Sequence, residues 1–319
     1  MEDLLLSIQN LRVEYTTERA VVHALNGLNL KIKKGESLGL VGETGAGKTT
    51  TALSILNLLP QQIGRIVAGE ILFDGKSVLT MKNKELEEIR GDKISMIFQN
   101  PLTSLNPVFT VGEQIAMVLR KHQHMAPKDA MKRAGELLEM VGIAPSRVRD
   151  YPNQFSGGMR QRVGIAASLA CNPELLIADE PTTALDVTIQ AQILELMKGL
   201  QSQYATSLLM ITHNLGIISE MCENVAVMYA GRVIEYGSVK EVFKNPMHPY
   251  TVGLLGALPK LTGPRDRLMA IPGRIADAQN LPSGCRFHPR CNHCTEECKK
   301  IQPGMRQVNA DHYVECFCN

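Results

Sequence analysis

The chain has 319 residues, of which 44% are hydrophobic and 21% charged, so it can bury a core, and disordered, collagen-like and low-complexity classes are excluded. Lys and Arg (34) nearly balance Asp and Glu (32), and a net charge of +2 gives no electrostatic footprint for bulk nucleic acid or an anionic membrane. No apolar run reaches the roughly 18 residues of a bilayer-spanning helix, and the acidic start does not resemble a signal peptide. We therefore expect a chain that stays in the cytosol.

The first quarter of the chain predicts strands. Apolar residues between polar ones mark residues 11–15, 24–32 and 70–73. Asp74-Gly75 is a hairpin-turn signal, because glycine tolerates the positive φ that a tight turn needs. Residues 37–41 differ, since they form a short, continuously apolar run that ends in a glycine-rich loop.

The middle of the chain predicts helices followed by buried strands. Prolines divide residues 101–172 into several helices. Apolar runs at residues 93–99, 175–178 and 207–211 suit parallel strands that are buried on both faces. Between the last two, apolar residues recur at helical spacing behind Asp186, an N-cap candidate. This alternation implies an α/β core with a mostly parallel sheet.

The composition changes after about residue 245. Residues 225–234 predict two closing strands around Ala230-Gly231, whereas prolines break up residues 246–319, which we call the tail. We expect a loop-rich tail that needs a cross-link, such as a bound metal or a disulfide, to be stable. Six of the eight cysteines lie in it, and in a reducing compartment such a cluster predicts a metal site first and disulfides second. The other two, Cys171 and Cys222, are expected to be small buried hydrophobic residues.

Residues 42–49 fit the pattern G-x-x-x-x-G-K-[ST]. Glycines let backbone N–H groups wrap a β-phosphate, Lys48 places a positive charge at the β and γ oxygens, and Thr49 offers a hydroxyl to Mg²⁺. The following helix aims its N-terminus at the anion. A glycine-rich turn with a stray lysine is the alternative, but the apolar strand before the loop and the apolar helix after it favour nucleotide binding.

Two further segments carry chemistry. The strand at residues 175–178 is followed by Asp179, which can hold Mg²⁺, and Glu180, which can orient and deprotonate a water for attack on the γ-phosphorus. Earlier, Ser156-Gly157-Gly158 opens a helix with a hydroxyl, bare amides and a helix dipole, an arrangement suited to an anion. Taken alone, each segment could be an ordinary helix cap.

In this order the motifs resemble those of the nucleotide-binding subunit of an ATP-binding cassette (ABC) transporter. The resemblance implies an α/β P-loop ABC ATPase cassette over residues 1–245, with a mostly parallel sheet core, an antiparallel β subdomain and a helical subdomain at about 101–172. The tail, residues 246–319, would be a loop-rich, cysteine-containing C-terminal appendage. The usual signature reads Leu-Ser-Gly-Gly-Gln, and here Phe155 and Met159 replace its ends.

The resemblance assigns roles to individual residues. Tyr15 would stack on adenine, Gln99 would contact Mg²⁺ and water, and His213 would be the switch histidine. The implied catalytic residues are Glu180, His213, Gln99 and Lys48, and the implied Mg²⁺ ligands are Thr49, Gln99 and Asp179. The implied ATP-binding residues are Tyr15, Gly42, Thr44, Gly45, Ala46, Gly47, Lys48, Thr49, Thr50, Gln99 and Asp179, together with Ser156, Gly157 and Gly158, which would reach the ATP of a partner chain.

The resemblance also implies an assembly. ATP would be held between two chains, so that the partner is a second homologous ATPase subunit or a second copy of this one. Two transmembrane permease subunits would bind the pair at the cytoplasmic face of the cell membrane, and an extracytoplasmic substrate-binding protein would act indirectly. Nucleic acid is not an expected partner.

The tail resembles one subfamily, the oligopeptide and dipeptide importers, with nickel importers as close relatives. The matching segments are residues 245–251, 255–259, 271–273 and 284–291. The implied function is ATP hydrolysis that powers import of di- or oligopeptides. The nearest alternative is the same ATPase powering import of nickel or another metal complex. A soluble, non-transport ABC ATPase is the alternative from another class, disfavoured by the single cassette and by the lack of long heptad repeats. A P-loop kinase or GTPase is disfavoured by the Ser-Gly-Gly turn and His213.

Some members of this subfamily hold a [4Fe–4S] cluster on four tail cysteines. That spacing carries over to Cys285, Cys291, Cys298 and Cys316, and thiolates are the ligands such clusters use. Cys294 and Cys318 are additional, and they are alternative ligands because the spacing from Cys291 to Cys298 through Cys294 is itself ferredoxin-like. Zinc would suit four thiolates equally well, and free thiols are the third possibility.

Overall fold

The computed structural model describes residues 3–18, 20–99, 105–182, 186–257 and 271–318. They form two compact units. The first consists of Met1–Leu5, Ile32–Ser37 and Ser77–Thr212, and the second of Leu6–Lys31, Leu38–Lys76 and His213–Asn319. Each unit is a discontinuous stretch of chain, so residues far apart in sequence share one core.

The first unit is built on three parallel strands. These are β6 (Ile94–Ile97), β7 (Leu175–Asp179) and β8 (Ser207–Ile211), in the order β8-β7-β6. Every residue in them is buried, which explains their continuous apolar sequence. The three predicted parallel strands are thus confirmed.

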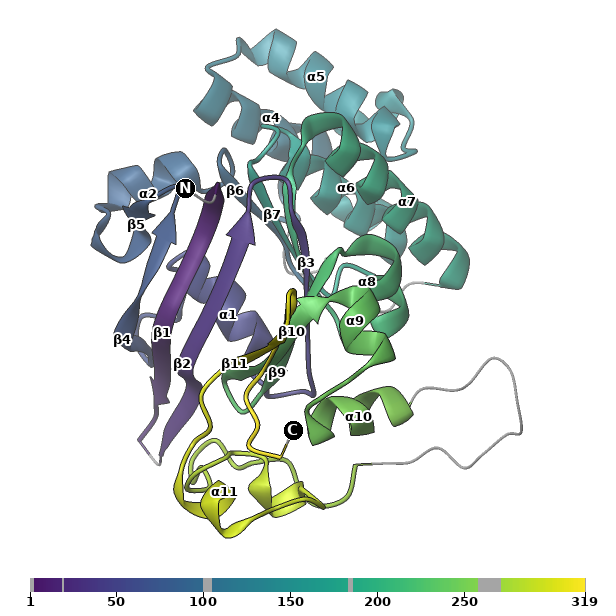
Figure 1. The fold of residues 1–319 in the computed structure, drawn as a ribbon. Helices are drawn as coiled ribbons and strands as arrows, with labels where there is room; N and C mark the ends of the chain where they lie inside the picture. Colours follow the sequence, from purple (N-terminus) through teal and green to yellow (C-terminus); the bar gives the residue numbers. More distant parts are fainter. Residues whose placement is uncertain (1–2, 19, 100–104, 183–185, 258–270, 319) are drawn as a thin grey trace. The chain divides into compact units, whose positions relative to one another are not determined.

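Helices surround these strands in the described part of the first unit (Figure 1). They are α2 (Asn83–Ile89), α4 (Val111–Gln123), α5 (Pro127–Met140), α6 (Gly157–Leu169) and α7 (Val187–Tyr204), with short 3₁₀ turns at Val78–Thr80, Pro145–Arg149 and Pro152–Gln154. Helices α4, α5 and α6 pack against one another, and α6 also packs on β6. Asp186 caps α7 as predicted, because its Oδ1 accepts a hydrogen bond of 2.9 Å from the Ile189 amide.

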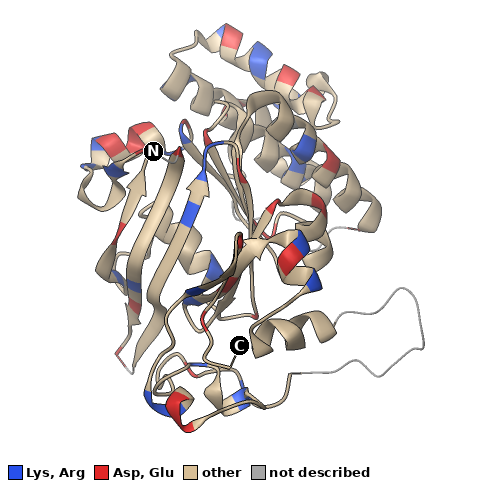
Figure 2. Ribbon diagram, in the orientation of Figure 1, with Lys and Arg blue, Asp and Glu red and all other residues tan. Residues whose placement is uncertain are grey.

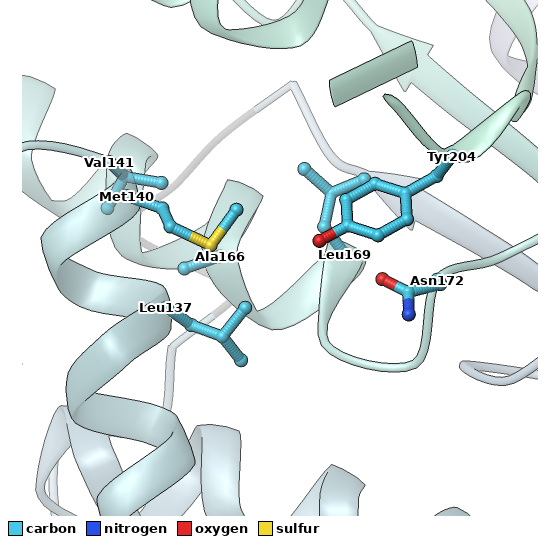
Figure 3. A pocket seen from close by; sticks show the side chains of 7 residues that line it. All are labelled: Leu137, Met140, Val141, Ala166, Leu169, Asn172 and Tyr204. Carbon is cyan, nitrogen blue, oxygen red and sulfur yellow. The ribbon is translucent and has the colours of Figure 1, made fainter. Parts of the chain in front are cut away.

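A small apolar cavity lies between these helices (Figure 3). Its volume is about 10 Å³, no more than one water occupies. The lining side chains are Leu137, Met140, Val141, Ala166, Leu169, Asn172 and Tyr204. An almost wholly apolar space of this size is a packing defect and holds no substrate.

The second unit contains an antiparallel sheet in the order β2-β1-β4-β5. Its strands are β1 (Leu4–Thr16), β2 (Val21–Lys33), β4 (Gly64–Phe73) and β5 (Lys76–Ser77), of which β1, β2 and β5 carry end residues that belong to the first unit. Asp74 and Gly75 turn between β4 and β5 with φ of 46° and 76°, the positive values that a tight hairpin turn requires. The predicted hairpin is confirmed. Strands β1, β2 and β4 extend beyond the predicted segments at residues 11–15, 24–32 and 70–73.

A second group of strands in this unit follows the order β11-β12-β10-β9-β3. Strand β3 (Ser37–Val41), whose first residue belongs to the first unit, is parallel to β9 (Asn224–Tyr229), and β10 (Arg232–Ser238) is antiparallel to β9. The tail supplies β11 (Arg306–Asn309) and β12 (His312–Val314), and β12 pairs with β10. The expectation of a loop-rich tail did not include these two strands, because both are short and carry no clear alternation.

The remaining helices of the second unit are short. They are α1 (Lys48–Ile55), α8 (Leu215–Met221), α9 (Val239–Lys244), α10 (Pro249–Gly256) and α11 (Glu296–Lys300), with a 3₁₀ turn at His288–Arg290. Within the described ranges, no helix has the length and apolar character needed to cross a bilayer. Lys and Arg alternate with Asp and Glu along helices such as α5 (Figure 2), so neither sign dominates that helix.

The two cysteines outside the tail are buried, as expected. Cys171 is 8% and Cys222 9% exposed. Burial raises the pKa of Cys171 to about 11 and that of Cys222 to about 12. Both thiols are therefore neutral core side chains at physiological pH.

Candidate nucleotide-binding site

The phosphate loop joins β3 to α1 in the second unit. A Cβ on Gly42 would lie 2.3 Å from the Met228 carbonyl oxygen, so only glycine fits at the loop entrance. Gly45 and Gly47 have φ of 82° and 103°, a region that side chains disfavour. Gly47 is also the N-cap of α1 and contributes no side-chain cap. The first amides of α1 are therefore presented by bare backbone, as an anion site requires.

Lys48 is folded back onto this loop. Its side chain is buried, and Nζ donates to the carbonyl oxygens of Gly42 (2.7 Å) and Glu43 (3.1 Å). Thr44, Gly45 and Thr49 are exposed. An ammonium held beside exposed amides and a hydroxyl can transfer its hydrogen bonds to phosphate oxygens.

Tyr15 lies next to the start of α1. Its hydroxyl is 3.3 Å from Thr50 Oγ1, and its ring packs so closely on Gly64 that a Cβ there would approach Tyr15 to 3.0 Å. The ring is partly exposed. The structure thus brings together two residues that were predicted separately to contact the nucleotide, Tyr15 and Thr50.

The carboxylate pair lies at the end of β7 in the first unit. Asp179 is 2% exposed, and Glu180 follows with φ of 48°, a left-handed conformation that is uncommon for a glutamate and costs energy. The Glu180 amide donates to the Ile211 carbonyl (2.8 Å), and Gln99 Nε2 donates to Glu180 Oε2 (3.1 Å). Two of the predicted catalytic residues, Gln99 and Glu180, are therefore in contact.

The Ser-Gly-Gly turn begins α6 in the same unit. Ser156 is the N-cap, with Oγ accepting from the Met159 amide at 3.4 Å. Ser156 and Gly157 are exposed, and a Cβ on Gly157 would meet no atom within 4 Å. Phe155, one of the departures from the usual signature, is 3% exposed and lies 4.1 Å below the guanidinium of Arg147. The substitution thus alters packing behind the turn and leaves its anion-facing groups in place.

Sequence reasoning missed Gln161. It is 3% exposed on α6, and its Nε2 donates to the Pro181 carbonyl at 2.8 Å. The bond ties the helix that begins with Ser156 to the residue after Glu180. A buried glutamine within an otherwise polar run carries no distinctive sequence signal, so only the three-dimensional contact reveals it.

The predicted residues therefore fall into groups that each lie within one unit. Tyr15 and residues 42–50 belong to the second unit, and Gln99, Asp179, Glu180 and the turn at 156–158 to the first. His213 is exposed between β8 and α8, and it is the first residue of the second unit's last segment.

The six tail cysteines gather around α11. The Cys285 amide donates to the Cys298 carbonyl (2.8 Å), and Cys318 Sγ donates to the His293 carbonyl (3.0 Å). Burial raises the pKa of Cys285 to about 11, opposed by a hydrogen bond from the Phe287 backbone and supported by smaller contributions from the neighbouring Cys298, Cys316 and Cys291. These four thiols are thus near one another. Thr295 Oγ1 lies 3.2 Å from Cys298 Sγ.

In the described chain no three Cys, His, Asp or Glu side chains converge closely enough to share one metal ion. The donor set of Cys285, Cys291, Cys298 and Cys316 consists of thiols alone, and thiolates are ligands for both [4Fe–4S] clusters and zinc.

Comparison with known proteins identifies the family. The model for "ABC transporter" matches residues 25–183, and the model for "Oligopeptide/dipeptide transporter, C-terminal region" matches residues 234–298. The oligopeptide transport ATP-binding protein AppD of Bacillus subtilis (strain 168) is 48% identical over 315 residues, covering 98% of this chain and 96% of AppD. The chain belongs to the ABC transporter family. Its resemblance to an ABC ATP-binding subunit, expected from the motifs, is confirmed.

Two further comparisons support this ABC assignment. The dipeptide transport ATP-binding protein DppD of Bacillus subtilis (strain 168) is 46% identical over 98% of this chain and 94% of DppD. A solved structure of the ATP-binding cassette MJ0796, described as a dimeric post-hydrolysis state bound to ADP and Pi, superposes with a TM-score of 0.67 at 30% identity. That superposition covers 73% of this chain and 98% of MJ0796. The P-loop ABC ATPase fold is confirmed.

Proposed function

We propose that this chain is the ATP-hydrolysing subunit of an importer for di- or oligopeptides. One observation carries the proposal: a phosphate loop with a buried lysine and a bare helix start lies in a chain that aligns over 98% of its length with oligopeptide and dipeptide transport ATP-binding proteins. The C-terminal model that matches residues 234–298 belongs to the same transporters.

In the proposed reaction the chain's own residues bind and orient the nucleotide. Tyr15 stacks on the base, the amides of residues 44–49 surround the phosphates, and Lys48 moves its hydrogen bonds from loop carbonyls to the β and γ oxygens. Mg²⁺, when bound, neutralises charge that develops on the phosphates, and Thr49, Gln99 and Asp179 would hold it.

Glu180 is the proposed general base. Its carboxylate accepts from Gln99, so the two side chains can position one water between an acceptor and a donor. Glu180 removes a proton from that water as its oxygen attacks the γ-phosphorus, the bond from the γ-phosphorus to the β–γ bridging oxygen breaks, and ADP leaves. The proposed role of His213 is to hold the γ-phosphate during the attack. The left-handed backbone at Glu180 sets the direction in which its Cα–Cβ bond leaves the end of β7.

A second chain completes the site in this proposal. Ser156 and Gly157 are exposed at the start of α6, and the space beside Gly157 is open. These groups, with Gly158, would cap the γ-phosphate held by the phosphate loop of the other subunit. The second subunit is a homologous ATPase or another copy of this chain.

We infer the remaining assembly from the same likeness. Residues 1–245 form the cassette and residues 246–319 the C-terminal appendage. The pair of ATPase subunits binds two transmembrane permeases at the cytoplasmic face of the membrane, and an extracytoplasmic binding protein delivers the substrate.

Reconstitution tests the function. The chain is incorporated into proteoliposomes with two permeases and a binding protein of a peptide importer, and phosphate release is measured with the binding protein empty or loaded. We expect dipeptides or oligopeptides to stimulate hydrolysis several-fold, and Glu180→Gln to abolish the stimulation. Stimulation by Ni²⁺ and not by peptides would favour the nickel alternative. Hydrolysis indifferent to every component of the membrane complex would favour a non-transport ABC ATPase.

We further infer that Cys285, Cys291, Cys298 and Cys316 hold a [4Fe–4S] cluster, with Cys294 and Cys318 as alternative ligands and zinc as the alternative metal. The support is the thiol-only donor set and its mutual electrostatic influence. A metal group there would cross-link the loop that contains Cys285 to the strand end that contains Cys316, and so stabilise a segment with few apolar residues.

Metal analysis of anaerobically purified protein tests this inference. We expect about four irons per chain, broad visible absorbance, and loss of both in Cys316→Ser. Cys222→Ser is the matched control, since Cys222 is a buried thiol outside the tail. One zinc per chain, or no metal, would contradict the cluster without affecting the ATPase proposal.

A further inference from the structure

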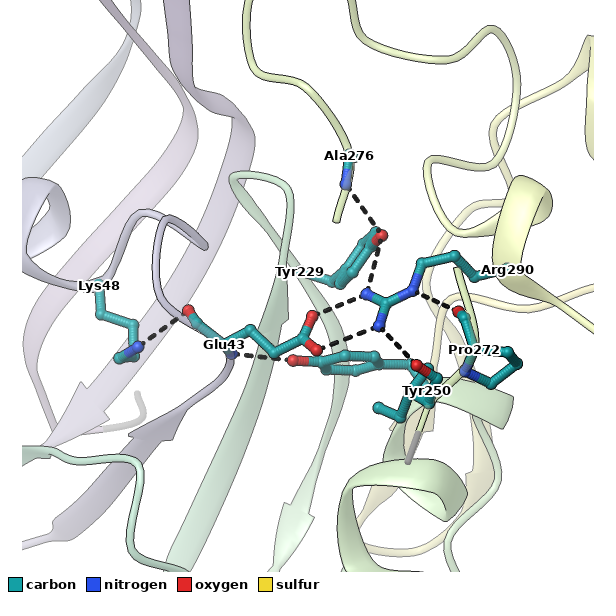
Figure 4. A network of polar contacts seen from close by, with 8 residues as sticks. Glu43, Lys48, Tyr229, Tyr250, Pro272, Ala276 and Arg290 are labelled. Carbon is teal, nitrogen blue, oxygen red and sulfur yellow. Dashed lines mark hydrogen bonds and ion pairs between the residues drawn. The ribbon is translucent and has the colours of Figure 1, made fainter. Parts of the chain in front are cut away.

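An ion pair joins the tail to the phosphate loop (Figure 4). Glu43 is the second residue of the loop, and its carboxylate accepts from both terminal nitrogens of Arg290, Nη1 to Oε2 at 2.7 Å and Nη2 to Oε1 at 3.1 Å. The Arg290 side chain is only 4% exposed and that of Glu43 23%. A shielded, two-pronged pair of this kind is much stronger than an exposed ion pair.

The tail, not the loop, sets the position of the guanidinium. Arg290 Nε donates to the Pro272 carbonyl at 3.0 Å, and Nη2 also reaches the Ile271 carbonyl at 3.4 Å. The Tyr229 hydroxyl lies 3.5 Å from Nη1. Hydrogen bonds to Glu43 raise the pKa of Arg290, so it stays charged. The cation is therefore a fixed part of the tail against which the loop is placed.

Glu43 is held at its backbone as well. Its amide donates to the Tyr250 hydroxyl at 2.9 Å, and its carbonyl accepts from Lys48 Nζ. Tyr250 comes from α10 and is fully buried, with its ring centroid 4.8 Å from that of Tyr229. The side chain, amide and carbonyl of one loop residue are thus each bonded, two of them to groups outside the loop.

The negative charge of Glu43 affects how well the loop can bind phosphate. A carboxylate at the second position of a loop that binds a polyphosphate repels its ligand unless a cation compensates it. Arg290 supplies that cation from the side of the loop that faces the tail. It also restrains the Gly42 and Glu43 carbonyls on which the Lys48 ammonium rests.

We propose that Arg290 is a positioning residue for ATP binding: it neutralises Glu43 and holds the first turn of the phosphate loop in its binding conformation. The inference rests on the proposed function, because it assumes that the loop binds ATP. It adds a residue of the C-terminal appendage to those that determine nucleotide affinity, although this residue touches no part of the nucleotide.

A double-mutant cycle tests the proposal. ATP affinity is measured by titration of a fluorescent ATP analogue, and kcat and KM by phosphate release, in the full chain, Arg290→Gln, Glu43→Gln and the double variant. Arg274→Gln is the matched control, because Arg274 is an exposed arginine of the same tail. We expect Arg290→Gln to raise Kd and KM for ATP at least about 10-fold, with kcat at saturating ATP changed less than about threefold.

The double variant separates charge compensation from a merely structural role. With Glu43→Gln also present no carboxylate remains unpaired, so we expect most of the lost affinity to return. A double variant that binds ATP as weakly as Arg290→Gln would overturn the proposal, and so would an Arg290→Gln variant that binds like Arg274→Gln.

If Arg290→Gln alone does not fold, the proposal is tested by comparing Glu43→Gln with the double variant. In the Glu43→Gln background, replacing Arg290 by Gln should change the Kd for ATP less than about threefold, and a loss of 10-fold or more would overturn the proposal. A parent chain that binds no ATP would instead contradict the proposed function itself. The two failures are therefore distinguishable.

Discussion

Gln99 and Glu180 are joined by a hydrogen bond of 3.1 Å between the ends of two neighbouring parallel strands. Strands β6 and β7 run side by side, so residues that follow their carboxyl ends meet at one edge of the sheet. The amide of Gln99 faces the carboxylate that we assign as the general base. Any water bound by Glu180 is then within reach of Gln99, and movement of Gln99 changes the environment of the base.

Glu180→Gln should separate ATP binding from hydrolysis. The amide keeps the shape of the side chain but cannot take a proton, so we expect phosphate release to fall at least about 100-fold, while the Kd for ATP stays within about threefold. ATP should then trap a closed dimer, detectable by size-exclusion chromatography. Glu174→Gln is the control, because Glu174 precedes β7 and its carboxylate pairs with Lys93 at an exposed site. Hydrolysis by Glu180→Gln at the parent rate would show that another group is the base.

Lys48→Ala should abolish useful nucleotide binding. The variant loses the buried ammonium that rests on the Gly42 and Glu43 carbonyls and can move to phosphate oxygens. We expect the Kd for ATP to rise about 10- to 100-fold. A titration with ATP, compared with Lys93→Ala, measures this. Equal affinity of the two variants would exclude Lys48 as a phosphate ligand.

Gly42→Ala should damage the loop through backbone packing. The new Cβ would sit 2.3 Å from the Met228 carbonyl oxygen, and the chain must shift to admit it, at a cost of about 2 kcal/mol or more in the free energy of unfolding. Gly164→Ala is the control, because its Cβ would meet open space in helix α6 and alanine favours a helix. Thermal unfolding followed by circular dichroism should give a lower midpoint for Gly42→Ala and an unchanged or higher one for Gly164→Ala.

Two inactive variants should restore activity when mixed, provided that the ATP site is shared between two copies of this chain. Lys48→Ala inactivates the loop. Ser156→Asp keeps an N-cap for α6 and adds a carboxylate where the γ-phosphate of the partner's ATP would lie. Random mixing gives half mixed dimers, each with one intact site, and so up to about one quarter of the parent activity. Failure of the mixture to regain activity would point to a heterodimer or to a site within one chain.

Local sequence patterns predicted the parts of this protein that depend on a few neighbouring residues. The phosphate loop, the N-cap at Asp186 and the hairpin at Asp74-Gly75 are all short motifs whose conformation follows from residue type. The buried strands β6, β7 and β8 were recognisable because strands covered on both faces are continuously apolar.

The features that were missed depend on contacts between distant residues. Arg290 and Glu43 are 247 positions apart, and Gln161 reaches Pro181 from another element. The pairing of β12 with β10 joins residues more than 70 positions apart through short polar segments. No local periodicity encodes such pairs, so the sequence could suggest residues that contact ATP but not Gln161 or Arg290, which act through contacts with distant residues.

Strand β12 has a practical consequence for handling the protein. It pairs with the hydrogen-bonding edge of β10. Glu315, just after it, forms an ion pair with Arg232, and the Glu315 amide donates a hydrogen bond to the Ile234 carbonyl. Shortening the gene to the minimal cassette would strip this cover and leave a bare row of amides and carbonyls able to recruit other molecules. We expect such truncated chains to aggregate on expression. An affinity tag placed after Cys318 should leave the pairing of β12 with β10 intact.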